Sequence, residues 1–178
     1  IGVMMHEYML DAWLQKLDNP IFRAIGEFLG VIGDNGILYF IIALILMLII
    51  KYRKAGIFLF INLFFCAGIG VVLKKIIGRE RPCFAHSQDV VCYIDEKQFT
   101  SCPSGHMIMA TAFCLVMCKY FPKYKWFWIG FTVLMGISRM YMGAHYLSDL
   151  LVSVMIAIIV FVVISIIWKQ YFRKHKVK

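Results

Sequence analysis

Residues 55–73, AGIFLFINLFFCAGIGVVL, carry no charged side chain and are followed directly by Lys74 and Lys75. A helix needs about 20 predominantly apolar residues to cross the hydrocarbon core of a bilayer, so this run predicts a membrane span. The whole chain fits that prediction, because 62% of its 178 residues are hydrophobic and its mean hydropathy is +0.79. The sequence therefore indicates an integral membrane protein. A membrane surface also explains the net charge of +9, which would suggest a nucleic-acid partner in a soluble protein.

Other apolar runs lie on both sides of this one. They cover residues 35–50, 104–118, 126–142 and 150–168. Together the five runs predict an all-α transmembrane helical bundle. Residues 6–18 have apolar side chains at helical spacing and predict an amphipathic helix along the membrane surface, with Trp13 as an interfacial anchor. Residues 20–34 predict a short interfacial or re-entrant helix.

The chain is expected to form a single domain over residues 1–178. Its expected parts are an interfacial N-terminal segment (1–34), a membrane core (35–168) and a basic cytoplasmic tail (169–178). The sequence carries no signal for an oligomeric state.

The charges of the connecting segments predict the sidedness of the protein. With five spans in series, residues 51–54, 119–125 and 169–178 fall on one side, and they contain eleven Lys or Arg and no Asp or Glu. The positive-inside rule places this side, with the C-terminus, in the cytoplasm. The candidate functional groups then face the periplasm or exterior of a bacterial cytoplasmic (inner) membrane.

Three clusters of polar residues meet on the outer side, and the first covers residues 74–82, KKIIGRERP. Lys74 and Arg81 are seven residues apart, which is two helical turns, so they share a face if the helix continues as far as the proline. The alternative is a basic collar in which side chains such as Lys75 and Arg79 extend toward lipid headgroups.

The second cluster covers residues 102–106, CPSGH, at the start of an apolar run. Ser104 follows a proline and suits a helix N-cap. The free N–H groups and positive dipole end of a helix also bind phosphate, so capping and phosphate binding are compatible here. His106 favours a catalytic site, because a cap does not need an imidazole.

The third cluster covers residues 138–149, SRMYMGAHYLSD. His145 and Asp149 are four residues apart on one helix face. The carboxylate can therefore accept the imidazole N–H and leave the other nitrogen as nucleophile or base. Arg139 points to a different face unless the helix breaks, and Gly143 offers that break. A purely structural His–Asp pair is the alternative.

Together the clusters supply what phosphoryl transfer requires, namely cations for the equatorial oxygens, a nucleophile, and an acid for the leaving oxygen. The sequence offers no group of carboxylates suited to two Mg²⁺ ions, since Asp149 is assigned to a histidine and Glu80 stands alone. Fixed cations can take the place of metal ions in this role. We therefore predict a metal-independent reaction with no cofactor and no metal site.

In order and spacing, the clusters resemble the three-part signature of the type 2 phosphatidic acid phosphatase (PAP2) superfamily. The matching residues are Lys74-x6-Arg81-Pro82, Pro103-Ser104-Gly105-His106 and Ser138-Arg139-x5-His145-x3-Asp149. The resemblance implies a helical bundle, commonly with six spans in membrane members. This chain has five apolar runs and a polar N-terminal helix, so we expect five to six spans.

The resemblance also implies roles for individual residues. His145 would be the nucleophile that forms a phosphohistidine, Asp149 would orient it, and His106 would protonate the leaving group. The phosphate would be held by Lys74, Arg81, Arg139, Ser104 and the N–H of Gly105.

Three cysteines, Cys83, Cys92 and Cys102, lie in the predicted outer loop, where oxidation is possible. A Cys83–Cys102 disulfide would join two motifs, and a pair between Cys92 and either of the others is also open. Zinc binding is disfavoured by the spacing. The loop from residue 84 to residue 100 is expected to roof the site, or to carry aromatic interfacial anchors.

These observations favour a membrane lipid phosphatase, with a lipid phosphate as substrate, the bilayer as its surroundings and no nucleic-acid partner. Among substrates that the resemblance implies, we place undecaprenyl diphosphate first, because it is displayed on the outer face. Lipid A 1-phosphate, phosphatidylglycerol phosphate and phosphatidic acid are the alternatives. An anion or lipid transporter would carry polar residues through several spans, and an inactive lipid-binding protein would have lost one of the two motif histidines or Asp149. The sequence has neither property.

Overall fold

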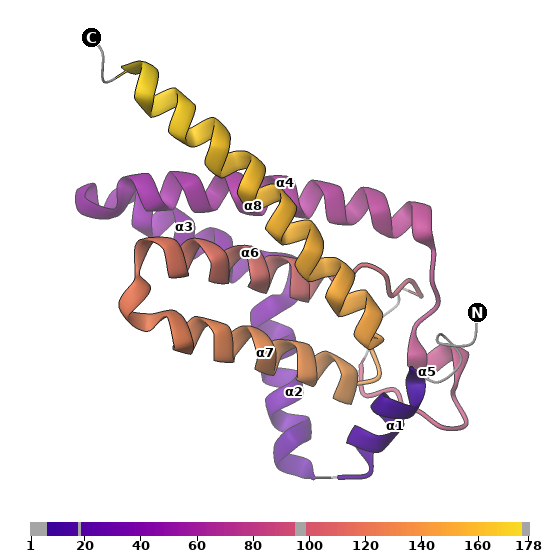
Figure 1. Ribbon diagram of the computed structural model, residues 1–178. Coiled ribbons are helices and arrows are strands. Elements are labelled where there is room, and N and C mark those ends of the chain that lie inside the picture. Colours follow the sequence, from indigo (N-terminus) through magenta and orange to yellow (C-terminus); the bar gives the residue numbers. More distant parts are fainter. Residues whose placement is uncertain (1–6, 18, 95–98, 176–178) are drawn as a thin grey trace.

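The computed structural model describes residues 7–17, 19–94 and 99–175, and it is a bundle of helices (Figure 1). Six longer helices form the bundle: α2 (Pro20–Gly33), α3 (Ile37–Leu48), α4 (Arg53–Ile77), α6 (Gly105–Tyr120), α7 (Lys125–Tyr141) and α8 (Leu147–His175). Two short helices, α1 (Tyr8–Gln15) and α5 (Pro82–Ala85), lie at one end. The described residues contain no β-strand, only an isolated bridge between Glu80 and Thr100. The predicted all-α fold is confirmed.

Three helical stretches of the described chain are long and apolar enough to cross a membrane: Pro20–Leu48, Ile50–Ile77 and Leu147–Lys174. The two longest predicted apolar runs, 55–73 and 150–168, lie within the second and third stretches. Helix α6 is apolar but has 16 residues, and α7 has 17, so both are shorter than the usual span.

The N-terminal third differs from the expectation of a separate interfacial segment that ends at residue 34. Helices α2 and α3 are joined only by the short 3-10 turn η1 (Asp34–Gly36), and together they make the first long apolar stretch. Asn35 and Gly36 have φ values of 49° and 69°, a left-handed conformation that glycine and asparagine tolerate best. The chain therefore turns at η1, and Figure 1 shows α2 and α3 running in different directions.

Helix α1 is confirmed as a helix, and Trp13 is 58% exposed, as an interfacial anchor requires. Its polar side chains, however, face the protein. The Gln15 side-chain amide donates to the carbonyls of Val91 and Tyr141 and accepts from the Val91 N–H. Asp11 is fully buried. Helix α1 is thus docked on the end of the bundle that carries the three motif clusters, and it also presents apolar side chains to the surroundings.

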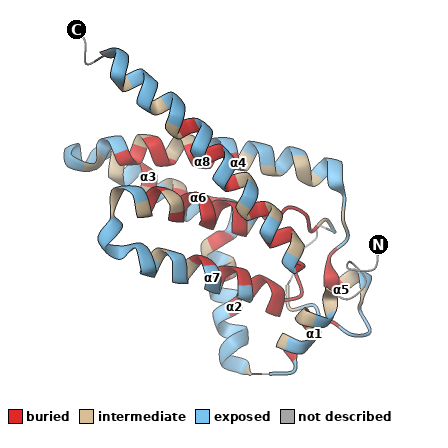
Figure 2. Cartoon of the chain, in the orientation of Figure 1, coloured by how far each residue is buried: buried red, intermediate tan, exposed pale blue. Residues whose placement is uncertain are grey.

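The core lies where α4, α6 and α8 pack together, and α6 is buried along most of its length (Figure 2). The turns that join α3 to α4 and α6 to α7 lie at one end of the bundle, toward the C-terminus (Figure 1). The end of α4 and the starts of α6 and α8 lie at the other end, with the end of α7. The fold therefore separates the basic turns from the three motif clusters, as the sequence predicted.

Candidate active site

The first cluster is not one continuous helix, so the condition under which Lys74 and Arg81 would share a helix face is not met. Helix α4 ends at Ile77, because Gly78 adopts a left-handed conformation with φ of 59°. Arg81 is extended, and the proline after it begins α5 instead of ending α4. Lys74 and Arg81 nevertheless line the same cavity, since the chain turns back toward the bundle axis.

The second cluster caps α6. Ser104 is fully buried, its Oγ accepts from the Met107 N–H at 3.4 Å, and its own N–H donates to Ser153 Oγ at 2.8 Å. The N-cap interpretation of Ser104 is confirmed. The Ser104 hydroxyl caps its own helix, and Ser104 does not line the cavity. Gly105 and His106, the first two residues of α6, do line it.

Helix α2 approaches the site so closely that its backbone holds two of the predicted residues. The Gly30 carbonyl lies 3.1 Å from His106 Nε2, and the Gly26 carbonyl accepts a hydrogen bond from Arg139 Nη2. A Cβ atom on Gly33 would overlap the His106 ring. Sequence reasoning missed these contacts, although the spacing of Gly26, Gly30 and Gly33 on one helix face was a visible signal for close packing.

The third cluster breaks at Gly143, as predicted. This residue has φ of 71°, and a Cβ atom there would lie 2.7 Å from the Val91 carbonyl oxygen. The break lets Arg139, in the last turn of α7, and His145, just before α8, line one cavity.

His145 and Asp149 face each other, but their contact is longer than predicted. His145 Nδ1 lies 3.9 Å from Asp149 Oδ2, and Nδ1 has no hydrogen-bond partner in the described part of the chain. Asp149 Oδ2 instead accepts from the Tyr146 N–H at 3.0 Å. His145 is 1% exposed. This burial, with the charges of Arg81 and Lys74, lowers the pKa of His145 well below its ordinary value, so its imidazole is neutral at pH 7.

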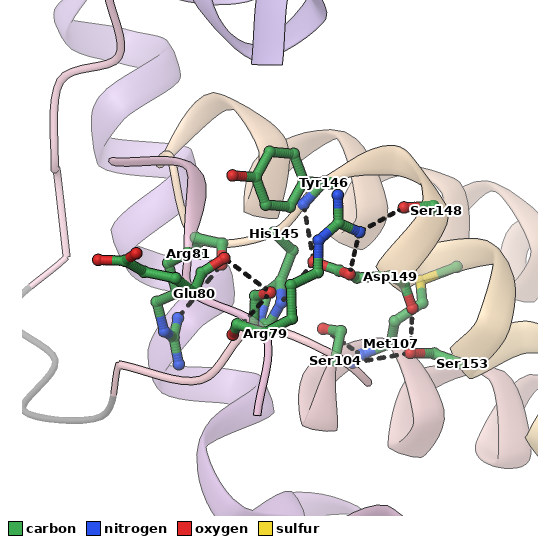
Figure 3. Close-up of polar contacts among 12 residues, drawn as sticks. Arg79, Glu80, Arg81, Ser104, Met107, His145, Tyr146, Ser148, Asp149 and Ser153 are labelled. Carbon is green, nitrogen blue, oxygen red and sulfur yellow. Dashed lines mark hydrogen bonds and ion pairs between the residues drawn. The ribbon is translucent and has the colours of Figure 1, made fainter. Parts of the chain in front are cut away.

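The other oxygen of Asp149 is bound by Arg79, for which the sequence left open a role in a collar of side chains directed toward lipid headgroups. Arg79 Nη1 donates to Asp149 Oδ1 at 2.8 Å, and Figure 3 shows the guanidinium between Asp149 and Ser148. The pKa of Arg79 is raised above its ordinary value. Burial by itself would lower this pKa, but the negative charges of Asp149 and Glu7 have the larger effect. The collar alternative is therefore wrong for Arg79.

A cavity of about 780 Å³ unites the predicted residues. Its walls include Lys74, Arg81, Gly105, His106, Arg139 and His145. Ser104 and Asp149 lie behind the walls as supports. The cavity extends between η1 and the outer half of α4, along the apolar side chains of Ala67 and Val71. The arrangement gathers three guanidinium or ammonium groups and two imidazoles beside Ala67 and Val71, and the lining on the α2 and η1 side also includes Glu27 and Asp34.

The outer loop covers this cavity as predicted, since Tyr93 and Ile94 line it. The proposed Cys83–Cys102 disulfide is wrong. Cys83 is bonded to Cys92, because α5 and the turn after it bring their Cα atoms to 4.9 Å, while Cys102 is a buried free thiol. The Cys83 N–H also donates to the Gly143 carbonyl, which fixes the bonded loop onto the third cluster.

Comparison with known proteins identifies the family. Residues 55–174, more than half of the chain, match the PAP2 superfamily. The chain belongs to the PAP2 superfamily. The match includes all three clusters around the cavity, and it confirms the family that the motif spacing predicted.

PAP2 relatives with curated functions are similar to part of the chain. A lipid A 1-phosphatase from Rhizobium johnstonii is 32% identical over 99 residues, which are 54% of this chain and 41% of that protein. The undecaprenyl-diphosphatase BcrC of Bacillus subtilis is 33% identical over 92 residues, 52% of this chain and 47% of that protein. The chain thus spans less than half the length of the curated relatives it matches.

Two solved PAP2 structures share the fold over most of the chain. A transmembrane PAP2 type phosphatidylglycerolphosphate phosphatase from Bacillus subtilis has a TM-score of 0.76 at 21% identity, covering 95% of this chain and 87% of that one. Aquifex aeolicus LpxE has a TM-score of 0.77 at 21% identity, covering 88% and 92%. These likenesses establish a membrane-protein fold of the PAP2 type.

Proposed function

We propose that this protein is a membrane lipid phosphatase that hydrolyses a phosphate monoester or diphosphate of a lipid through a phosphohistidine. The observation that carries the proposal is the cavity itself. It places a buried neutral His145 beside Lys74, Arg81 and Arg139, and it continues along apolar side chains between η1 and α4. A phosphate headgroup fits the cationic part, and a lipid tail fits the apolar part.

The proposed chemistry follows from the positions of the two histidines. Asp149 faces Nδ1 of His145, so Nε2 is the nitrogen left to attack phosphorus. As the N–P bond forms, the bond from phosphorus to the lipid or diphosphate oxygen breaks, and His106 in its imidazolium form donates a proton to that oxygen and becomes neutral. Water then attacks phosphorus, His106 takes a proton from the water, and the N–P bond breaks, which releases inorganic phosphate and regenerates free His145.

The three cations would bind the equatorial oxygens, where negative charge is concentrated in the transition state. The Gly105 N–H, at the start of α6, adds a donor and the positive end of a helix dipole. In this role Ser104 acts indirectly, because its hydroxyl caps α6 and its N–H binds Ser153.

Undecaprenyl diphosphate is the substrate that we place first, and lipid A 1-phosphate is the second candidate. Relatives named for each of these activities match about half of the chain with similar identity, 32% for the lipid A 1-phosphatase and 33% for the undecaprenyl-diphosphatase. Phosphatidylglycerol phosphate and phosphatidic acid complete the set to be tested.

The cavity is proposed to open on the outer face of the cytoplasmic membrane of a bacterium. The basic turns and the C-terminal helix end lie at the opposite end of the bundle, which the positive-inside rule assigns to the cytoplasm. A C-terminal tag should resist protease in right-side-out vesicles until they are permeabilised. A tag cleaved in intact vesicles would contradict this orientation.

The test of function is phosphate release from the four lipid phosphates by the purified protein in detergent, with and without EDTA. We expect release from at least one lipid, unchanged by EDTA, and a loss of about 10³-fold or more in His145→Ala. The matched control is His86→Ala, because His86 stacks on Tyr8 at the outer end but does not line the cavity.

Each part of the proposal has its own contrary outcome. Full activity in His145→Ala would exclude His145 as the nucleophile. Loss of activity in EDTA, restored by a divalent cation, would overturn metal-independent catalysis. Absence of release from every lipid would overturn the lipid phosphatase assignment.

A further inference from the structure

Arg79 lies behind the catalytic pair, outside the cavity walls, and it binds three partners at once. Its Nη1 donates to Asp149 Oδ1 at 2.8 Å and to Ser148 Oγ at 2.6 Å, and its Nη2 donates to Glu7 Oε2 at 3.1 Å. The guanidinium carbon lies 3.8 Å from the centre of the Tyr146 ring. These contacts fix the guanidinium plane from several sides (Figure 3).

Glu7 closes this network from the N-terminal end of α1. Its Oε2 accepts from Ser148 Oγ at 2.6 Å as well as from Arg79. Arg79 therefore divides its charge between two carboxylates. Glu7 is partly exposed, with 17% of its side chain accessible, whereas the Asp149 side chain is fully buried.

The network accounts for the long distance within the catalytic pair. One oxygen of Asp149 is held by Arg79 and the other by the Tyr146 N–H, so the carboxylate is not turned toward His145 Nδ1, 3.9 Å away. A carboxylate whose charge is shared with a guanidinium also attracts a proton on a neighbouring imidazole less strongly.

We infer that Arg79 is a positioning residue for the catalytic pair and that Glu7 modulates it. Arg79 holds the Asp149 carboxylate and partly neutralises its charge, and it thereby keeps His145 unprotonated and nucleophilic. Glu7 also binds Arg79, and its negative charge offsets part of the positive charge that Arg79 places beside Asp149, which limits this effect. This inference rests on the proposed function, in which His145 is the nucleophile.

The sign of the effect does not depend on which member of the pair carries the proton. Without Arg79, the Asp149–His145 pair binds an added proton more tightly, because a positive charge beside the pair has been removed. Without Glu7, the pair binds it less tightly. The other charged or titratable groups that act on the pair stay in place in both variants: Lys74, Arg81, His106 and Arg139 around His145, and Asp11 and Cys102 near Asp149.

The experiment measures kcat/KM for lipid phosphate hydrolysis against pH in Arg79→Gln, Glu7→Gln and Lys75→Gln. In Arg79→Gln the acid limb should move up by about one pH unit, as expected for the loss of one charge a few ångströms from the pair. In Glu7→Gln it should move down. Lys75→Gln is the matched control: it removes a positive charge from an exposed side chain on the same segment, and its profile should match the wild type.

Two further measurements separate positioning from phosphate binding and from folding. Arg79→Gln should bind inorganic phosphate as the wild type does, because Arg79 does not line the cavity, whereas Arg81→Gln should bind it more weakly. Arg79→Lys should restore the position of the acid limb, since it restores the charge, with a lower kcat because one ammonium cannot bridge both carboxylates.

An acid limb that stays at the wild-type pH in both Arg79→Gln and Glu7→Gln would overturn the inference, as would a shift of equal size in Lys75→Gln. If Arg79→Gln does not fold, the acid limb of Glu7→Gln decides: a shift to lower pH supports the inference, and an unchanged position overturns it. If the wild type hydrolyses none of the lipids, the proposed function has failed. The inference is then decided by the pKa of His145 itself, followed by NMR of ¹⁵N-labelled histidine and expected to rise in Arg79→Gln.

Discussion

Replacement of Gly33 by alanine tests whether α2 sets the position of His106, the proposed catalytic acid. A Cβ atom at Gly33 would lie 3.2 Å from Cγ and 3.3 Å from Nε2 of His106, and closer still to Cδ2, whereas ordinary van der Waals contact begins at 3.4 Å. The backbone at Gly33 has φ of −85°, which alanine adopts without strain. The substitution therefore acts on the imidazole and not on the helix.

The imidazole must move by about 1 Å to restore a normal contact, and its bond to the Gly30 carbonyl would then be lengthened or broken. A displacement of this size at a catalytic group can lower the rate about 100-fold, so we expect kcat to fall between about 10-fold and 100-fold in Gly33→Ala. This corresponds to a rise of roughly 1.4 to 2.7 kcal/mol in the activation barrier. KM should change less, because Lys74, Arg81 and Arg139 still bind the phosphate.

The assay is phosphate release under saturating lipid, with the melting temperature in detergent as a check on folding. Gly68→Ala is the matched control, because it makes the same change in α4, where a Cβ atom meets nothing within 4 Å. It should leave kcat unchanged. A wild-type kcat in a folded Gly33→Ala protein would refute the conclusion that close packing of α2 positions His106.

Three further predictions concern the outer end of the molecule. Burial raises the pKa of Asp11 to about 8, so the folded protein holds this carboxyl in its protonated form. The free energy of unfolding should therefore fall as pH rises from about 4 to 8, by up to about 5 kcal/mol. Asp11→Asn should raise the melting temperature at pH 8 but not at pH 4. Peptide mapping without reduction should find Cys83 linked to Cys92, with Cys102 alkylated only after denaturation; a peptide linking Cys102 would contradict this pairing. Gln15→Ala should destabilise the protein by about 2 to 3 kcal/mol in thermal unfolding, because three hydrogen bonds to the outer loop and α7 are lost, and an unchanged melting temperature would count against docking of α1.

Local signals in the sequence were sufficient for the helical fold and for the cationic and imidazole side chains of the cavity wall, but not for the part of the wall that α2 and η1 supply. The uncharged runs 55–73 and 150–168 can only be long helices in a membrane, because hydrocarbon leaves a backbone no other hydrogen-bond partners. Gly143 was recognised as the break that brings Arg139 and His145 into one site, because the two residues would face different sides of an unbroken helix and glycine readily adopts the conformation of a break.

Local signals failed where the chain changes direction and where one cysteine could pair with either of two others. The spacing of Lys74 and Arg81 suggested a continuous helix, but a left-handed Gly78 ended it first. Three outer-loop cysteines allowed several pairings, and the turn after α5 decided between them by bringing Cys83 and Cys92 together.

The sequence by itself determined the membrane location of the chain, its helical class, its PAP2 signature and the identities of the groups that line the cavity. These properties depend on residue type and on spacings of a few positions along one helix. The tertiary structure alone decided what holds those groups in place: the α2 carbonyls behind His106 and Arg139, and Glu7 with Arg79 behind Asp149. All four of these contacts join residues at least 70 positions apart, and a backbone carbonyl is the same in every residue type, so it leaves no signal in the sequence. They become visible only when packing of the apolar faces has brought the segments together.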